Sequence, residues 1–338
     1  MSGDGLRIFS LHETRALTER IATALEVPVS PLEERAFDGG EHKSRPLASV
    51  RGDDVYVIQS LHGDAELSAN DKLCRLLFLI GTLLDSGARR VTAVLPYLCY
   101  SRKDRRTKPR DPVTTRYVAM LLEAVGTHCV LTVDVHNSAA YQNAFRCQCE
   151  HLEAAPLFVD HYCRTLSSET LLTVVSPDVG GIKRAQAFRM ALAHARGDSV
   201  GMAFVEKYRS RDELSGGALV GEVEGRGAIL YDDIISSGAT LGKAAAACRA
   251  AGAAAVYAAA THGLFNRQAI EVLQSAAIEE IVVTDSAAGN RAGELAARVR
   301  VIDCAPLLAE SVRRLHTHGS LIELLDPSGE ILERRAGP

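Results

Sequence analysis

Short apolar runs recur along this chain, and each is followed by a stretch with helical spacing. Val91–Pro96, Val130–Val135 and Ala228–Tyr231 are mostly apolar without regular polar alternation, whereas Asn70–Ser86 repeats leucine or isoleucine every three or four positions. A continuous apolar strand is typical of a parallel sheet that helices cover on both faces. The pattern therefore predicts an α/β fold with doubly wound, mostly parallel sheets flanked by helices.

The alternation of strands and helices runs twice, which indicates two tandem domains. We place the N-terminal domain at residues 1–153 and the C-terminal domain at 154–310, and we expect a C-terminal segment, 311–338, to pack back on the N-terminal domain. Asp134–His136 ends a strand in the first half as Asp232–Asp233 does in the second. The two halves are therefore expected to correspond in order, as in a duplicated domain.

The composition excludes several classes of protein. A net charge of −4 over 338 residues lacks the basicity of a nucleic-acid binder, and no apolar run is long enough for a membrane span. The first residues have no basic segment followed by an apolar stretch, so we expect a cytoplasmic protein. The eight cysteines are expected to be reduced thiols. Cys147, Cys149 and His151 could serve as zinc ligands, but no second ligand pair follows at finger-like spacing.

The most informative motif follows Ala228–Tyr231. Asp232 and Asp233 stand at the end of this run, and the small residues Ser236–Thr240 open an alanine-rich helix. Carboxylates at the carboxyl end of a buried strand can accept sugar hydroxyls, and the N–H groups of a helix N-terminus attract an anion. The motif indicates a site for a phosphorylated pentose. Taken alone, it also fits an ordinary strand, turn and helix with Ser or Thr as N-cap.

Cationic segments elsewhere favour a polyphosphate ligand. Tyr97–Pro112 gathers arginines and lysines after a strand, and its prolines keep it out of a helix. Glu206–Asp212 is a second basic stretch, which could close over a polyphosphate and neutralise charge in a transition state. An exposed charged hairpin would have the same composition.

Two further side chains stand at strand ends and suit a divalent cation. His136 and Asp178 each follow an apolar run. An imidazole and a carboxylate would suit a Mg²⁺ ion that keeps several waters and bridges substrate phosphates. Whether the two side chains meet stays open at this point, and a structural role for each is equally consistent with the sequence.

In their order and spacing these segments resemble the ribose-phosphate pyrophosphokinase family, from about Phe9 to about Leu325. The motifs that carry the resemblance are Phe37–Glu41, Tyr97–Asp111, Asp134–His136, Ser176–Gly181, Lys207–Arg209 and Asp232–Thr240. The resemblance implies two tandem phosphoribosyltransferase-like domains and an enzyme of nucleotide biosynthesis. It implies Mg²⁺-dependent transfer of the β,γ-diphosphoryl group of ATP to the 1-hydroxyl of ribose 5-phosphate, giving phosphoribosyl diphosphate and AMP.

The resemblance also implies which residues form the site. The implied ATP-binding residues are Phe37, Gly39, Gly40, Glu41, Arg102 and Lys103. The implied catalytic residues, which stabilise the transition state, are Lys207 and Arg209. Ribose 5-phosphate would contact Arg209, Asp232, Asp233, Ser236, Ser237, Gly238, Ala239 and Thr240. The implied metal ligands are His136 and Asp178.

The chain departs from many bacterial members of that family at several positions, two of them in motifs of the implied site. Gly39–Glu41 lacks a carboxylate that is common there, and the sugar-phosphate loop begins with Ser236 where Asp is frequent. The resemblance is therefore to a divergent member.

The implied partners are the small molecules ATP and ribose 5-phosphate, with neither nucleic acid nor a membrane. The resemblance also implies a homo-oligomer, dimer-based and often hexameric, in which Phe37 reaches a neighbouring subunit's site. Two alternatives stay open: a phosphoribosyltransferase, and a non-catalytic regulatory subunit associated with a synthetase. The basic loops and His136 favour ATP chemistry over the first, and retention of Lys207, Arg209 and Asp178 counts against the second.

Overall fold

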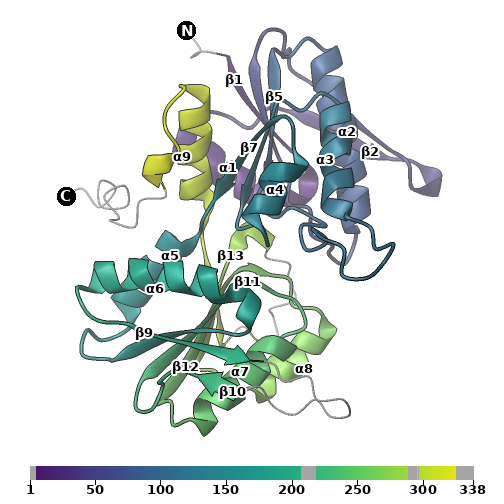
Figure 1. Ribbon diagram of the computed structural model, residues 1–338. Coiled ribbons are helices and arrows are strands. Elements are labelled where there is room, and N and C mark those ends of the chain that lie inside the picture. Colours follow the sequence, from purple (N-terminus) through teal and green to yellow (C-terminus); the bar gives the residue numbers. More distant parts are fainter. Residues whose placement is uncertain (1–4, 207–217, 288–294, 296, 325–338) are drawn as a thin grey trace. The chain divides into compact units, whose positions relative to one another are not determined.

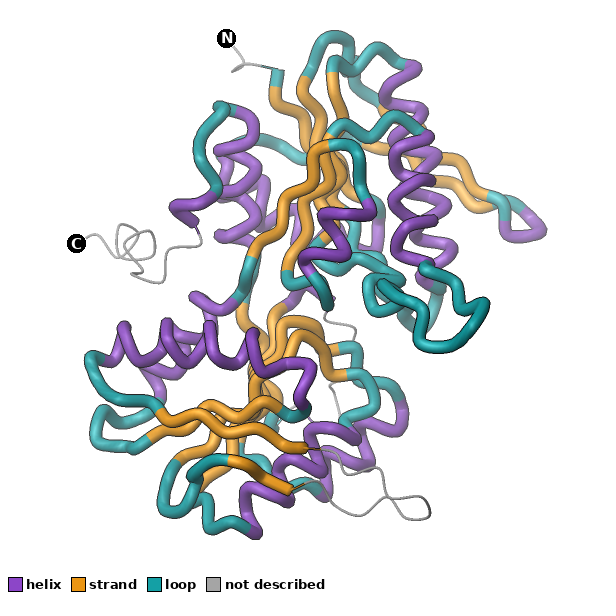
Figure 2. The backbone as a smooth tube through the Cα atoms, viewed as in Figure 1, coloured by secondary structure: helices purple, strands orange, loops and turns teal. Residues whose placement is uncertain are grey.

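A computed structural model of the chain describes residues 5–206, 218–287, 295 and 297–324. It divides into two compact units (Figure 1): unit 1 joins Met1–Glu153 to Cys304–Leu324, and the described part of unit 2 lies within Ala154–Asp303. Each unit contains a mostly parallel sheet with helices against it (Figure 2), so the predicted fold class is confirmed.

The sheet of unit 1 is built from the apolar runs of the first half. Neighbouring strands run parallel in the spatial order β1 (Leu6–Ser10), β4 (Asp54–Ile58), β5 (Arg90–Leu95), β6 (Cys129–Val133) and β7 (Gln148–Leu152). Every residue of β4 and β6 is buried, which explains why neither strand alternates polar and apolar residues. β7 is an edge strand and is correspondingly polar.

Helices cover both faces of this sheet. Figure 1 shows α2 (Ala69–Asp85) and α3 (Thr114–Ala124) on one side, and α1 (Arg15–Leu25) with α9 (Ala305–His316) on the other. The short helix α4 (Ser138–Ala144) connects β6 to β7. α2 begins with a capping box, in which the side chains of Ser68 and Asp71 each accept the other residue's backbone N–H.

An antiparallel hairpin, β2 (Leu32–Ala36) with β3 (His42–Pro46), reaches out past α2 and α3 (Figure 1). The sequence patterns did not predict it, because its strands are largely polar and exposed. Charged side chains pair across it instead, as in the 2.8 Å contact between Lys43 Nζ and Glu33 Oε1.

Helix α9 returns the chain to unit 1. It packs on α1, and Arg313 Nη2 donates to the Ala24 carbonyl at 2.9 Å. His316 Nδ1 lies 2.7 Å from Asp54 Oδ2, and Arg90 Nε donates to Asp54 Oδ1 at 2.6 Å. Burial disfavours the charge of Asp54, but these two partners hold the pKa of its carboxyl below the usual value. The return begins at Cys304, ahead of the predicted segment 311–338, of which residues 325–338 lie outside the described part.

The sheet of unit 2 is parallel except at one edge. Its spatial order is β10 (Ala218–Val220), β9 (Gly201–Glu206), β8 (Leu172–Ser176), β11 (Gly227–Ile235), β12 (Ala255–Gly263), β13 (Glu280–Thr284) and β14 (Val299–Ile302), with β10 antiparallel to β9. The helices are α5 (Ala155–Thr165), α6 (Ile182–Arg196), α7 (Ala239–Ala250) and α8 (Arg267–Ser275).

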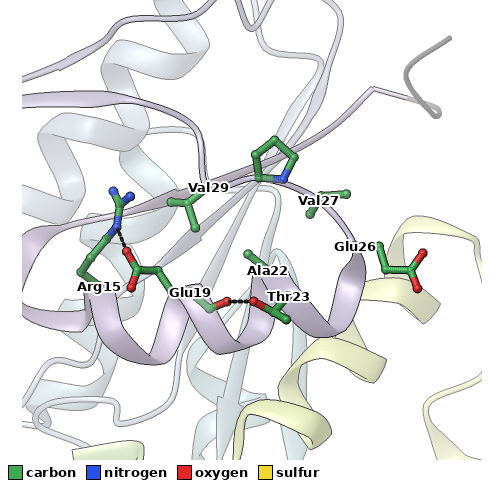
Figure 3. A pocket seen from close by; sticks show the side chains of 8 residues that line it. Arg15, Glu19, Ala22, Thr23, Glu26, Val27 and Val29 are labelled. Atoms are coloured by element: carbon green, nitrogen blue, oxygen red, sulfur yellow. Dashed lines mark hydrogen bonds and ion pairs between the residues drawn. The ribbon is translucent and has the colours of Figure 1, made fainter.

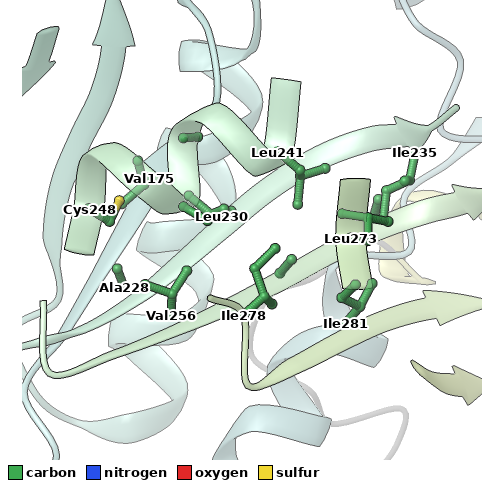
Figure 4. Packing of buried hydrophobic residues seen from close by; sticks show 14 of the residues in the cluster. Val175, Ala228, Leu230, Ile235, Leu241, Cys248, Val256, Leu273, Ile278 and Ile281 are labelled. Atoms are coloured by element: carbon green, nitrogen blue, oxygen red, sulfur yellow. The ribbon is translucent and has the colours of Figure 1, made fainter. Parts of the chain in front are cut away.

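Small side chains let α7 approach this sheet closely. Figure 4 shows Leu241 and Cys248 of α7 packed with Leu230 and Val256 of the sheet, and Ala244 in the same cluster is fully buried. Alanine at these helix positions loses little side-chain entropy and leaves room for the larger strand residues. This packing fixes the N-terminus of α7 against the end of β11.

The strand order reverses in unit 2. The chain passes from β8 to β9 on one side and later returns to β11 on the other side of β8. Ligands of open α/β sheets bind beyond the carboxyl ends of the strands at such a reversal. In unit 1 the strands cross the sheet in chain order without such a reversal, so the two sheets differ in strand order. In both units, however, the strand that leads to an acidic motif lies beside the strand before it in the predicted correspondence, β6 beside β5 and β11 beside β8.

Among the helices of the described residues, none is both long and apolar enough to cross a membrane.

Removing the Asp54 carboxylate should weaken unit 1. We expect Asp54→Ala to lower the free energy of unfolding by about 3 kcal/mol, because it leaves Arg90 largely buried without its partner. Asp53→Ala is the matched control: that carboxylate pairs with the more exposed Arg7, and its loss should cost less than about 1 kcal/mol. Urea unfolding followed by circular dichroism compares the two variants, and equal losses would contradict the assignment.

Candidate functional site

The acidic pair lies within strand β11. The sequence predicted a strand that ends at Tyr231, but β11 continues to Ile235 because β12 runs beside it, with Asp232 opposite Ala260. The side chain of Asp233 is 4% exposed and that of Asp232 is 19% exposed. The structure thus places two adjacent carboxylates in a largely buried setting at the carboxyl half of a central strand.

A single guanidinium holds both acids. Arg184 Nη1 donates to Asp232 Oδ1 at 3.0 Å and to Asp233 Oδ1 at 2.9 Å. One positive charge cannot offset two negative charges, so burial and then the charge of Asp233 raise the pKa of Asp232. Sequence reasoning missed Arg184. The sequence feature that could have identified it is an arginine in the first turn of a helix that follows a strand-end loop. Such a position lies at the edge of the sheet where ligands bind.

The loop after the acids presents a helix N-terminus. α7 begins at Ala239, one residue before the predicted start, and its N-cap, Gly238, has φ +71°. A Cβ at Gly238 would lie 2.9 Å from Leu273 Cγ, so only glycine fits there. Gly238 has no side chain that could cap this helix, and the contact from the Ala239 N–H to Ser237 Oγ is long, at 3.5 Å. The first N–H groups of a helix have no partner within it. The predicted residues Ser236–Thr240 therefore form a turn suited to an anion.

Asp178 follows β8, the strand beside β11. Its Oδ1 accepts the backbone N–H groups of Gly180 at 3.0 Å and Gly181 at 3.2 Å, which fixes the turn that opens α6. Ser176 Oγ donates to the Asp178 carbonyl at 2.6 Å. Asp178 thus has a structural role in this turn, at the same edge of the sheet as Asp232 and Asp233.

The basic loop of unit 1, residues 97–112, contains no helix or strand. Asp111 organises it: Oδ2 accepts from Thr107 Oγ1 at 2.6 Å and from Lys108 N at 3.0 Å, and these bonds lower the pKa of Asp111. Lys103 Nζ lies 3.9 Å from the same oxygen. Arg102 is exposed and makes no hydrogen bond or ion pair with another residue that the structure describes. The loop presents cations that are available to a ligand.

His136 lies beside this loop. It is exposed in the turn between β6 and α4, where Asn137 caps α4 by accepting the Ala140 N–H at 3.1 Å. Asn137 Nδ2 also donates to Asp104 Oδ2 at 2.7 Å. The structure therefore brings the turn of His136 together with the loop of Arg102 and Lys103.

Phe37 lies at the tip of the β2–β3 hairpin. The guanidinium of Arg35 covers its ring at 5.0 Å, and the ring remains 41% exposed. Gly39 and Gly40 have φ +85° and +87°, which glycine adopts without strain, and Glu41 follows them. Within unit 1 this tip projects with the hairpin past α2 and α3 (Figure 1), so it is not gathered at the sheet edge with the basic loop.

Some predicted residues lie outside the described part of the chain. Lys207 and Arg209 belong to the segment 207–217, which the structure does not describe. Among the residues that it does describe, no group of three His, Cys, Asp or Glu side chains is placed to hold a metal ion, and Nε2 of His151 accepts the Val135 N–H. Burial raises the pKa of the Cys147 thiol to about 11, as expected for an unreactive thiol.

A shallow hollow of about 310 Å³ lies along α1 in unit 1 (Figure 3). Arg15 and Glu19, which line it, satisfy each other at 2.8 Å, and Thr23 Oγ1 donates to the Glu19 carbonyl. None of the predicted site residues lines this hollow.

Comparison with known families matches both parts of the chain. A family model for the N-terminal domain of ribose phosphate pyrophosphokinase covers residues 6–126, and one for a phosphoribosyl synthetase-associated domain covers residues 208–326. A ribose-phosphate pyrophosphokinase from Granulibacter bethesdensis is 38% identical over 322 residues, which is 95% of this chain and 100% of the relative. A putative ribose-phosphate pyrophosphokinase 2 from Streptococcus pyogenes is 37% identical, with 96% of each chain covered.

A solved structure shows the same fold. The crystal structure of phosphoribosylpyrophosphate synthetase from Mycobacterium smegmatis superposes with a TM-score of 0.83 at 32% identity, and the match covers 94% of this chain and 100% of that one.

The buried acidic pair should make stability depend on pH. The raised pKa of Asp232 means that its proton stays on in the folded state at about pH 5 but is lost from the unfolded chain, so stability falls as pH rises through the folded-state pKa. Asparagine does not titrate. We expect the unfolding free energy of Asp232→Asn, relative to the parent protein, to rise by about 1 kcal/mol or more between about pH 5 and pH 8. The control is Asp160→Asn, which replaces a partly exposed carboxylate on α5 that pairs with Arg164 and should show a smaller change, measured by urea unfolding at each pH.

Proposed function

The chain belongs to the ribose-phosphate pyrophosphokinase family, and from this membership we propose that it makes phosphoribosyl diphosphate and AMP from ribose 5-phosphate and ATP. In this reaction the 1-hydroxyl of the sugar attacks the β-phosphorus of ATP, and AMP leaves. The observation that carries the proposal is the acidic pair Asp232–Asp233, held by Arg184 beside the N-terminus of α7.

The acceptor site lies in unit 2. Asp232 and Asp233 would accept hydrogen bonds from the ribose hydroxyls, since ionised carboxylates are acceptors only. The 5-phosphate would sit at Ser236–Thr240, where N–H groups and the helix dipole favour an anion. The spacing of diol and phosphate in a pentose phosphate suits these two neighbouring features.

The donor site draws on unit 1. Arg102 and Lys103 would contact the triphosphate, because the basic loop presents its cations at the carboxyl ends of β5 and β6. Phe37 would stack on adenine, with Gly39, Gly40 and Glu41 around the nucleoside. The position of this hairpin tip supports a contribution to a neighbouring subunit's site, so we propose a dimer-based homo-oligomer. We also propose that the enzyme acts in the cytoplasm.

The residues present fit Mg²⁺ held chiefly by the substrate. Asp178 carries the carboxylate oxygens that Mg²⁺ prefers, and its Oδ1 also accepts the N–H groups of Gly180 and Gly181. Asp178 and His136 would hold it. When bound, the ion neutralises charge on the diphosphoryl group that is transferred.

The chain's own residues then position the two substrates and stabilise the charge of the transition state. Phosphoryl-type transfer requires little more than this. No activated protein nucleophile is needed. We propose that Lys207 and Arg209 donate to the diphosphoryl oxygens in the transition state, and that Arg209 also contacts ribose 5-phosphate.

A direct assay tests the proposed function. We expect purified protein with ribose 5-phosphate, ATP and Mg²⁺ to form AMP and phosphoribosyl diphosphate in equal amounts. Phosphorus NMR measures both products. Formation of ADP would exclude diphosphoryl transfer. Absence of turnover, with and without inorganic phosphate, would favour a non-catalytic subunit. Consumption of phosphoribosyl diphosphate with a nucleobase would indicate a phosphoribosyltransferase.

Removal of Lys207 tests the transition-state role. We expect Lys207→Ala to lower kcat by about two orders of magnitude or more while leaving ATP binding nearly unchanged, because the lost interaction develops only in the transition state. Steady-state kinetics and calorimetric titration with ATP measure the two effects. Arg164→Ala, which removes an exposed cation of α5, is the control and should keep the parent kcat. An unchanged rate in Lys207→Ala would remove this residue from the mechanism.

A further inference from the structure

The turn that presents His136 is held by an imidazole from a neighbouring strand. The backbone N–H of Val135 donates to Nε2 of His151, on edge strand β7, at 3.1 Å. The preceding Asp134 N–H donates to the Leu152 carbonyl at 2.9 Å. The two residues before His136 are therefore both fixed to β7, one through backbone and one through a side chain.

This turn needs such support. Asp134 has φ +39°, a left-handed conformation that a residue with a Cβ rarely adopts. Such a conformation persists only where the surrounding structure holds it. Asp134 and Val135 are both buried, so water does not replace the bonds to β7.

The partner defines the chemistry of the His151 ring. A backbone N–H can only donate, so Nε2 must present its lone pair, and the proton of the neutral ring is on Nδ1. The ring also packs against Tyr141, with centroids 6.5 Å apart, and the Tyr141 hydroxyl donates to the Val130 carbonyl at 2.8 Å. The acceptor nitrogen is thus held in place by an aromatic side chain that is itself anchored to β6.

The other side of His136 is held as well. Asn137 caps α4 and donates to Asp104 of the basic loop at 2.7 Å. His136 is therefore an exposed residue between two neighbours whose positions are set by side-chain hydrogen bonds.

We infer that His151 is a positioning residue for His136. By accepting the Val135 N–H, it sets the backbone conformation from which His136 meets the metal–nucleotide complex. This inference rests on the proposed function for its consequence in catalysis, while the hydrogen bond itself can be tested without any substrate.

Two substitutions separate the acceptor from the packing. His151→Leu keeps an apolar body against Tyr141 but offers no acceptor, whereas His151→Gln places Oε1 at about the reach of Nε2 and can accept the same N–H. If the Leu variant does not fold, His151→Asn replaces it, because its oxygen reaches only the level of Nδ1. Tyr141→Phe is the matched control, since it loses the hydroxyl bonds of the same cluster and leaves His151 in place.

The first measurement is amide hydrogen exchange of the segment 131–137, with no ligand present. We expect exchange in His151→Leu to be about tenfold faster than in the parent protein, and near the parent rate in His151→Gln, since one hydrogen bond is lost and then restored. Unchanged exchange in the Leu variant overturns the inference, whatever the enzyme's activity proves to be.

The second measurement is the Mg²⁺ concentration that gives half-maximal activity. Loss of a residue that orients a metal ligand costs about tenfold or more in metal affinity, so this concentration should rise about tenfold in His151→Leu and return toward the parent value in His151→Gln. Tyr141→Phe should lower the unfolding midpoint without this rise. Equal behaviour of the Leu and Gln variants, or of Leu and Tyr141→Phe, would reduce His151 to a packing residue.

Discussion

The parallel pairing of β8 with β11 is the constraint on which the acceptor site depends. The register places Val175 beside Leu230, so the two strands deliver Asp178 and the acidic pair to one edge of the sheet. Because α6 begins just after the turn of Asp178, its first turn carries Arg184 back over β11, within 3.0 Å of both carboxylates. Without that pairing, Asp232 and Asp233 would lack the Arg184 guanidinium, and burial would favour protonation of one carboxyl even more strongly.

Much of this arrangement was predictable from the sequence, because it depends on local patterns. Apolar runs and helical spacing predicted the strands and helices. In Asp232–Thr240, the residue types alone predicted a turn that suits an anion. Tertiary pairing decided the rest. The continuation of β11 to Ile235 comes from β12, and the β2–β3 hairpin is held by cross-strand charge pairs that have no apolar period. From the sequence alone, Arg184 looks like an ordinary exposed helix residue. Only the structure shows that it lies against β11 and bonds to Asp233.

The loops and turns that carry the candidate site residues are fixed by side-chain hydrogen bonds that residue type does not reveal. Asp178 accepts two N–H groups of its own turn, Asp111 accepts from two residues of the basic loop, and His151 accepts from the turn of His136. Each of these side chains is of a type that could bind a ligand or a metal. Each nevertheless uses an acceptor atom to hold the backbone of a nearby turn or loop. In loops without helix or strand, such bonds replace the missing ladder of backbone pairs. These bonds fix the backbone from which the exposed basic side chains and the His136 imidazole project.

The charge balance of the acidic pair links sugar binding to ionisation. With Arg184, the ionised pair keeps a net negative charge in a largely buried place, and the pKa of Asp232 is raised in consequence. Ribose hydroxyls that donate to the carboxylates would stabilise the ionised form and lower that pKa again. Below the raised pKa, the sugar therefore binds with release of a proton, and the affinity for the sugar falls as the solution becomes more acidic. Arg184 reduces this effect because it already stabilises part of the negative charge before the sugar arrives.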